Sequence, residues 1–122
     1  VKRKKIWHRY YFMLKNWATR TNVRLPTIPL HCESSYHMFY IIMPSKNSRD
    51  RLIDHLNKGE INSVFHYTPL HKSKVSKKFG WDNSKCPITI ETSRRIIRLP
   101  IYYSLKMKKI EHIINKIKDF QI

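Results

Sequence analysis

The sequence predicts a small α+β domain in which three short strands carry helices packed on one face. Apolar residues recur at helical spacing at both ends of the chain, and short apolar runs without that spacing lie between them. Proline and glycine residues separate these segments. With 122 residues, of which 41% are hydrophobic, the chain is long enough for one domain with a packed core.

The chain begins with a predicted helix over residues 4–17. Its apolar stripe follows spacings of three and four residues and contains Ile6, Tyr10, Met13, Leu14 and Trp17. We take residues 1–18 as an aromatic amphipathic helix, which packs either on this domain or on a part of the protein outside the chain. Residues 19–35 then form a connector, because Pro26 and Pro29 exclude a helix and a central strand.

Residues 36–122 make up the predicted α+β sandwich. Its first strand is the nearly continuous apolar run over residues 36–43, which we expect to be covered on both faces. Ser48 is the predicted N-cap of the helix that follows, and Arg51 at its third position excludes a capping box. That helix turns Leu52, Ile53 and Leu56 inward and ends with Gly59 at the C′ position.

The second half of the sandwich is predicted in the same way. Residues 61–65 form the second strand, and residues 96–99 form the third strand, which ends at Pro100. The polar, basic residues 72–85 are expected to be a long, mobile loop. Pro87 begins a short helix through residue 94, and Ser104 caps a final helix over residues 106–120. The stripe of that final helix contains Met107, Ile110, Ile113, Ile114 and Ile117.

The stretch V-F-H-Y-T-P-L-H, residues 64–71, is the first candidate for a binding site. Pro69 cannot donate a ladder hydrogen bond, so the chain leaves the sheet near His66 and continues as a stiff loop. The imidazoles of His66 and His71 and the phenol of Tyr67 can donate, accept or stack. The alternative is that these side chains are exposed on a surface loop and bind no ligand. No metal-ligand spacing is present in this stretch.

The net charge of +17 could attract nucleic acid or an anionic membrane. The lysines are spread from Lys2 to Lys118 and form no single block, which argues against a dedicated nucleic-acid surface. There is no apolar run long enough for a transmembrane helix, so we expect no membrane contact. The two cysteines, Cys32 and Cys86, form no C-x-x-C pair, and a reduced, cytoplasmic compartment is the simpler interpretation, with one disulfide left open.

Three segments in this order resemble one known family. They are H-M-F-Y-I at residues 37–41, V-F-H-Y-T-P-L-H at residues 64–71 and S-R-R-I-I-R-L-P-I-Y-Y at residues 93–103. Together they resemble the C-terminal domain of the sugar-nucleotide aminotransferases of the DegT/DnrJ/EryC1/StrS family. The resemblance covers nearly the whole chain and is nearest to the dTDP-4-amino-4,6-dideoxygalactose transaminases.

This resemblance implies the small domain of an aspartate-aminotransferase-like fold in a protein that is generally a homodimer. Such enzymes use pyridoxal phosphate (PLP), bound through a lysine Schiff base in a large domain. They move an amino group from glutamate to a dTDP- or other nucleotide-linked 4-keto-6-deoxy sugar, for lipopolysaccharide or surface polysaccharide. The large PLP-binding domain has no counterpart in these residues. We therefore expect the chain alone to hold no PLP, to lack catalytic and metal-binding residues and to be inactive, as a piece of a longer protein.

The resemblance also suggests which residues meet the substrate. The H-Y-x-P-L-H loop of the family lies near the mouth of the active site, so His66, Tyr67 and His71 are candidate substrate contacts. Arg98 and Tyr102, near the third strand, are weaker candidates, and for Arg98 a plain surface position is an equal alternative. Two other hypotheses remain in competition. One is a basic nucleic-acid-binding module that would use residues 2–5 and 72–78, with aromatic side chains such as Trp81 as stacking platforms. The other is an interaction domain without chemistry of its own.

Overall fold

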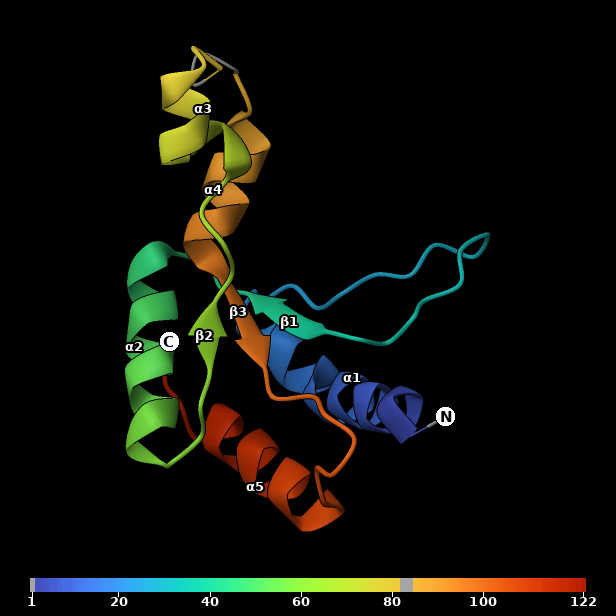
Figure 1. Ribbon diagram of the computed structural model, residues 1–122. Coiled ribbons are helices and arrows are strands. Elements are labelled where there is room, and N and C mark those ends of the chain that lie inside the picture. Colours follow the sequence, from blue (N-terminus) through green and yellow to red (C-terminus); the bar gives the residue numbers. More distant parts are fainter. Residues whose placement is uncertain (1, 82–84) are drawn as a thin grey trace.

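The computed structural model describes residues 2–81 and 85–122 of the chain (Figure 1). Three helices and two strands of this structure account for most of the core, and a third strand of two residues completes the sheet. In chain order, the elements are α1 (Lys2–Arg20), β1 (Phe39–Ile42), α2 (Lys46–Lys58), β2 (Val64–Phe65), the 3-10 turn η1 (Leu70–Lys72), α3 (Lys74–Lys78), α4 (Pro87–Arg95), β3 (Ile96–Leu99) and α5 (Met107–Lys118).

The sheet has the strand order β1-β3-β2, and both pairs are antiparallel. In the register of β1 with β3, Phe39 lies opposite Leu99 and Ile41 lies opposite Ile97. All four side chains are buried, so they form one apolar face of the sheet. The alternate residues of β1 are only half-buried. The expectation that both faces of this strand are covered is therefore wrong for the outer face.

Helix α1 supplies the aromatic part of the core. Tyr10 and Leu14 of the predicted stripe are buried, whereas Met13 is only half-buried. Trp7 is also buried, although the stripe did not include it. The rings of Trp7 and Tyr10 lie with their centroids 5.3 Å and 5.1 Å from that of Phe39, and the Tyr10 hydroxyl donates a 2.9 Å hydrogen bond to the carbonyl of Pro100. Since Pro100 directly follows β3, this bond joins the first helix to the last strand.

Helices α5 and α2 complete the layer on the apolar face. Helix α5 packs on both α1 and α2, and α2 also contacts β3 and α4 (Figure 1). The buried inward residues of these two helices are Leu52, Leu56, Ile110, Ile113, Ile114 and Ile117. The observed architecture is thus a three-stranded antiparallel sheet with helices packed on one face. This confirms the predicted α+β fold class.

The first strand is shorter than predicted, because it begins at Phe39 rather than at residue 36. Tyr36 has a φ of 51°, a left-handed conformation that interrupts an extended strand. In addition, β3 contains only four residues, so it offers partners only to Phe39–Ile42. The second strand is also shorter than predicted and consists of Val64–Phe65 alone.

The cap of α2 differs from the prediction. Ser45, not Ser48, is the N-cap, and the Ser45 side chain accepts a 3.1 Å hydrogen bond from the backbone N–H of Ser48. The Ser48 hydroxyl accepts in return from the backbone N–H of Ser45, also at 3.1 Å, so a capping box does form. At the other end, Gly59 has a φ of −90°, and the left-handed residue is Glu60, with a φ of 57°.

The region expected to be a mobile loop, residues 72–85, contains a short helix. Ser73 caps α3, because its side chain accepts a 3.1 Å hydrogen bond from the backbone N–H of Ser76. A helix of five residues is too short for its apolar period to show in the sequence. The part of the predicted loop at residues 82–84 lies outside the described residues.

The cap of the final helix also differs from the prediction. Helix α5 begins after Lys106, which makes no side-chain capping bond, whereas Ser104 lies in the preceding turn and is exposed. The two serines that were expected to cap helices therefore have different roles. Ser48 takes part in a capping box from the third helical position, while Ser104 caps nothing.

This difference between serines can be tested by substitution. We expect Ser45→Ala to lower the free energy of unfolding by about 0.5–2 kcal/mol, because the orphan N–H groups of α2 lose their partner. Ser104→Ala, the matched control, should change it by less than about 0.5 kcal/mol. Urea unfolding followed by circular dichroism measures both values. An equal loss in the two variants would contradict the observed caps.

Candidate functional site

The loop that follows β2 forms one wall of a hollow of about 550 Å³. Because β2 pairs with β3 only through Val64 and Phe65, the chain leaves the sheet at His66. Pro69 holds φ at −52° and leads into η1. The opposite wall comes from α4 and the first residue of β3. The lining residues are His66, Tyr67, Thr68, Pro69, Leu70, Ile88, Thr89, Thr92, Ser93 and Ile96.

The hollow combines an apolar wall with a few polar groups. Leu70 and Ile88 are among the most exposed apolar side chains of the structure, with 85% and 82% of their surface accessible. The rings of His66 and Tyr67 lie 5.1 Å apart. The Nδ1 atom of His66 is buried and has no hydrogen-bond partner among the described residues. A concave, mostly apolar surface with an unsatisfied polar atom is typical of a small-molecule site.

The other three candidate residues do not reach this hollow. His71 lies in η1, where its ring is half-buried. Arg98 lies in β3 between Tyr40 of β1 and Val64 of β2, on the face of the sheet turned away from the core. Tyr102 lines a smaller hollow of about 330 Å³ after the sheet. The structure thus brings His66 and Tyr67 together and leaves His71, Arg98 and Tyr102 apart from them.

The contribution of α4 was not predicted. Ile88, Thr89 and Thr92 lie on α4. This helix was predicted from Pro87 through residue 94, but not as a neighbour of the loop that follows β2. One signal was available in the sequence. Ile88 and Thr92 are four residues apart and so lie on the same face of the predicted helix. In the structure, no residue of this helix is fully buried. An apolar side chain on such a helix indicates a contact beyond the local core.

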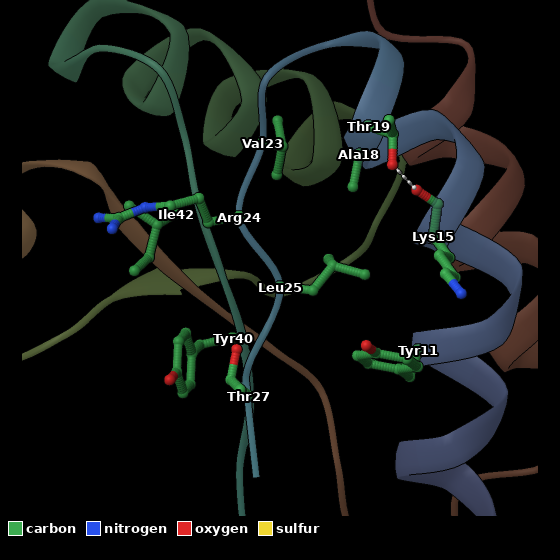
Figure 2. Close-up of a pocket in the computed structure, with 10 residues that line it drawn as sticks. All are labelled: Tyr11, Lys15, Ala18, Thr19, Val23, Arg24, Leu25, Thr27, Tyr40 and Ile42. Carbon is green, nitrogen blue, oxygen red and sulfur yellow. Dashed lines mark hydrogen bonds between the residues drawn. The ribbon is translucent and has the colours of Figure 1, made fainter. Parts of the chain in front are cut away.

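A second hollow, of about 490 Å³, lies between α1 and the chain that leads into β1 (Figure 2). Figure 2 shows Tyr11 and Leu25 facing each other from opposite walls, with Tyr40 beyond Leu25. The Thr19 hydroxyl donates a 3.1 Å hydrogen bond to the carbonyl of Lys15 in its own helix. Figure 2 shows the Tyr11 hydroxyl directed toward the apolar Leu25 rather than toward another polar group, so we assign no chemistry to this hollow.

Groups with displaced pKa values lie outside the hollow of His66 and Tyr67. Burial raises the pKa of Tyr10 well above its usual range, and the nearby Tyr102 raises it further. On α2, the hydrogen bond from Lys46 lowers the pKa of Asp50. Tyr10 stays protonated in the core, and Asp50 is a surface carboxylate. Both shifts therefore have structural causes and do not mark an acid–base catalyst.

Three further properties of the described residues bear on function. No three His, Cys, Asp or Glu side chains among them gather closely enough to hold a metal ion. Within residues 2–81 and 85–122, no helix combines the length and the apolar character needed to cross a bilayer. Cys32 and Cys86 are both free thiols.

Comparison with known proteins identifies relatives of the whole domain. The sequence profile of the DegT/DnrJ/EryC1/StrS aminotransferase family matches residues 1–118. The uncharacterized protein MJ1066 of Methanocaldococcus jannaschii is 28% identical over 97 residues, which are 76% of this chain and 25% of that protein.

Solved structures show the same fold. Spr1654 of Streptococcus pneumoniae, assigned as a sugar aminotransferase and solved in apo, PMP and PLP forms, is 26% identical, with a TM-score of 0.82 over 96% of this chain and 29% of its own. DesV of Streptomyces venezuelae, solved with a ketimine intermediate, has a TM-score of 0.83 at 22% identity over 97% of this chain and 30% of its own, which shows the fold alone. The chain spans less than a third of the length of these relatives.

The contacts that hold α4 in place can be tested by substitution. Helix α4 forms the wall of the hollow of His66 and Tyr67 that lies opposite the loop. Arg95 donates a 3.2 Å hydrogen bond to the carbonyl of Pro44 and lies 3.3 Å from the carboxylate of Glu91. We expect Arg95→Met to lower the free energy of unfolding by about 1–2 kcal/mol, because the Pro44 carbonyl loses its donor. Arg94→Met, at the exposed neighbouring position, should have little effect.

Urea unfolding measures the stability of both arginine variants, and amide hydrogen exchange reports on α4. Faster exchange in α4 should accompany the loss in Arg95→Met. If the Arg94 variant lost as much stability, the contact to Pro44 would not be what holds this wall.

Proposed function

This chain belongs to the DegT/DnrJ/EryC1/StrS aminotransferase family, and we propose that it forms the C-terminal small domain of a PLP-dependent sugar aminotransferase. The observation that carries the proposal is the family match over residues 1–118, in a chain that spans about 30% of its solved relatives. The PLP and PMP forms of the pneumococcal relative support PLP as the cofactor of the whole protein. A large cofactor domain supplies the remaining part.

The proposed reaction moves an amino group from glutamate to a nucleotide-linked 4-keto-6-deoxy sugar. The family and the motif at residues 64–71 support this choice of substrates. When bound, PLP provides the electron sink for such a transfer. We further propose that the whole protein is a homodimer in the cytoplasm, as its family resemblance implies.

The lysines described here do not suit a Schiff base with PLP. Lys116 is half-buried and every other described lysine is exposed. A nucleophilic lysine requires a desolvated or charge-tuned pocket that lowers its pKa. We therefore propose that no lysine of this chain forms the Schiff base with PLP, and we place that lysine in the large domain.

We propose that the hollow of His66 and Tyr67 binds the sugar nucleotide rather than the amino acid. Its imidazole and phenol can hydrogen-bond to sugar hydroxyls or phosphate. The apolar side chains of Leu70, Ile88 and Ile96 suit the methyl group that distinguishes a 6-deoxy sugar. His71, Arg98 and Tyr102 remain proposed contacts that require parts of the enzyme outside this chain to complete their surroundings.

The reading frame upstream of Val1 tests the domain proposal directly. We expect it to encode a large α/β domain that carries an S-x-x-x-x-K segment with the Schiff-base lysine. A stop codon or an unrelated domain immediately upstream would contradict the proposal.

The isolated 122-residue protein gives a biochemical test. After mixing with PLP and reduction with borohydride, we expect scattered, substoichiometric labelling of surface lysines, because none of the described lysines is buried. Intact mass and peptide mapping measure the label. A single lysine labelled to one equivalent would show that this chain forms the Schiff base itself.

In the whole enzyme, substitution should separate the two half-reactions. We expect Tyr67→Phe to slow the sugar half-reaction and to leave the glutamate half-reaction nearly unchanged, because a hydrogen bond to the sugar nucleotide is lost. The expected cost of about 0.5–3 kcal/mol corresponds to roughly 2-fold to 100-fold in kcat/KM for the sugar.

Tyr103→Phe is the matched control, since Tyr103 is an exposed tyrosine that lines a different hollow and is not a proposed substrate contact. Single-turnover stopped-flow measurements resolve the two halves for each variant. The assignment of the hollow would be wrong if Tyr67→Phe slowed both halves equally, or if only Tyr103→Phe affected the sugar half.

A further inference from the structure

Folding gathers lysines from two distant parts of the sequence at one end of the molecule. Lys2 and Lys5 of α1 line the same hollow, of about 720 Å³, as Lys106 at the start of α5. Lys4 and Lys5 line an adjoining hollow of about 480 Å³. Figure 1 shows the first turns of α1 and α5 on the same side of the molecule. We call Lys2, Lys4, Lys5 and Lys106 the basic end, and here the expectation that the lysines form no block is wrong.

Among the described residues, none of the four lysines of the basic end forms an ion pair with a carboxylate. Helix α5, which begins directly after Lys106, has no acidic residue in its first turn. The N-terminus of a helix already carries a partial positive charge and normally favours acidic side chains. Glu111, a carboxylate of α5 that reaches α1, is paired with Arg9 at 2.9 Å. The four lysines therefore create a positive electrostatic potential, and the N-terminus of α5 strengthens it.

Exposed aromatic rings lie among these lysines. Tyr103 is 74% exposed, and the Lys2 ammonium lies 4.5 Å from the centre of its ring. In the adjoining hollow, Phe12 is 69% exposed and lies nearly parallel to the His8 ring at 6.0 Å. Concave surfaces that alternate cations with stacking platforms are typical of single-strand binding, in which phosphates meet the cations and bases meet the rings.

We propose that the basic end binds single-stranded nucleic acid without sequence preference. This proposal does not depend on the aminotransferase reaction, because it rests on residues outside the hollow of His66 and Tyr67. An anionic membrane fits less well. The apolar stripe of α1, including Ile6, Tyr10 and Leu14, is buried in the core, so it cannot insert into lipid.

The experiment measures binding of a fluorescein-labelled dT20 oligonucleotide by fluorescence anisotropy over a series of salt concentrations. The triple variant K2Q/K5Q/K106Q should bind at least about 10-fold more weakly at 0.1 M salt. Its slope of log affinity against log salt should fall by about 2, because three phosphate contacts are lost at about 0.7 each. Tyr103→Ala should weaken binding of dT20 by about 5-fold or more and leave an abasic oligonucleotide of equal charge unaffected.

The matched control is K74Q/K77Q/K78Q, which removes the same charge from exposed lysines of α3. The melting temperature of the basic-end variant should equal or exceed that of the native protein, because lysines next to helix N-termini are removed. The proposal is overturned if the α3 variant loses as much affinity, or if Tyr103→Ala affects both oligonucleotides equally. It is also overturned if vesicles of phosphatidylglycerol bind through the basic end and dT20 does not.

Discussion

The packing of α1 against the sheet is the interaction on which the rest of this domain depends. Strands of four, two and four residues cannot bury their own apolar face. The rings of Trp7 and Tyr10 cover Phe39, and each buried aromatic contributes about 1.5–3 kcal/mol. The hydrogen bond from Tyr10 to Pro100 adds about 1 kcal/mol, so it fixes the geometry more than it supplies the stability. Because β3 runs directly out of α4, fixing β3 also positions one wall of the hollow.

Apolar periodicity predicted the elements whose residues are buried by this packing. Most of the stripes of the first and last helices and the limits of the third strand follow from residues such as Leu14, Ile97 and Ile113, because burial selects apolar side chains at the period of the element. The prediction was wrong for Met107, which is 47% exposed at the start of α5. The misplaced features depend on local hydrogen bonds instead. Ser45 and Ser48 both can cap a helix, and only the backbone geometry after Pro44 decides between them. A five-residue helix capped by Ser73 leaves no periodic signal.

The candidate site shows the same limit in tertiary structure. His66 and Tyr67 could be identified from one stretch of sequence, because a proline-stiffened loop after a strand concentrates polar side chains. The facing wall, with Ile88 and Thr92, lies more than twenty residues further along the chain and needed the packing of α4 to be placed. The basic end required the same kind of information, since Lys2 and Lys106 become neighbours only when α1 meets α5.

The contact between the two ends of the chain also sets the order of events during synthesis. Tyr10 bonds to a residue 90 positions later, and Arg9 pairs with one 102 positions later. At about 5–20 residues per second, roughly 5–20 seconds pass between the translation of α1 and that of α5. Throughout this time the aromatic side of α1 has no partner from the C-terminal helix. The nascent chain must therefore close its longest loop last, which slows folding and leaves a tryptophan-rich helix accessible to chaperones on the ribosome.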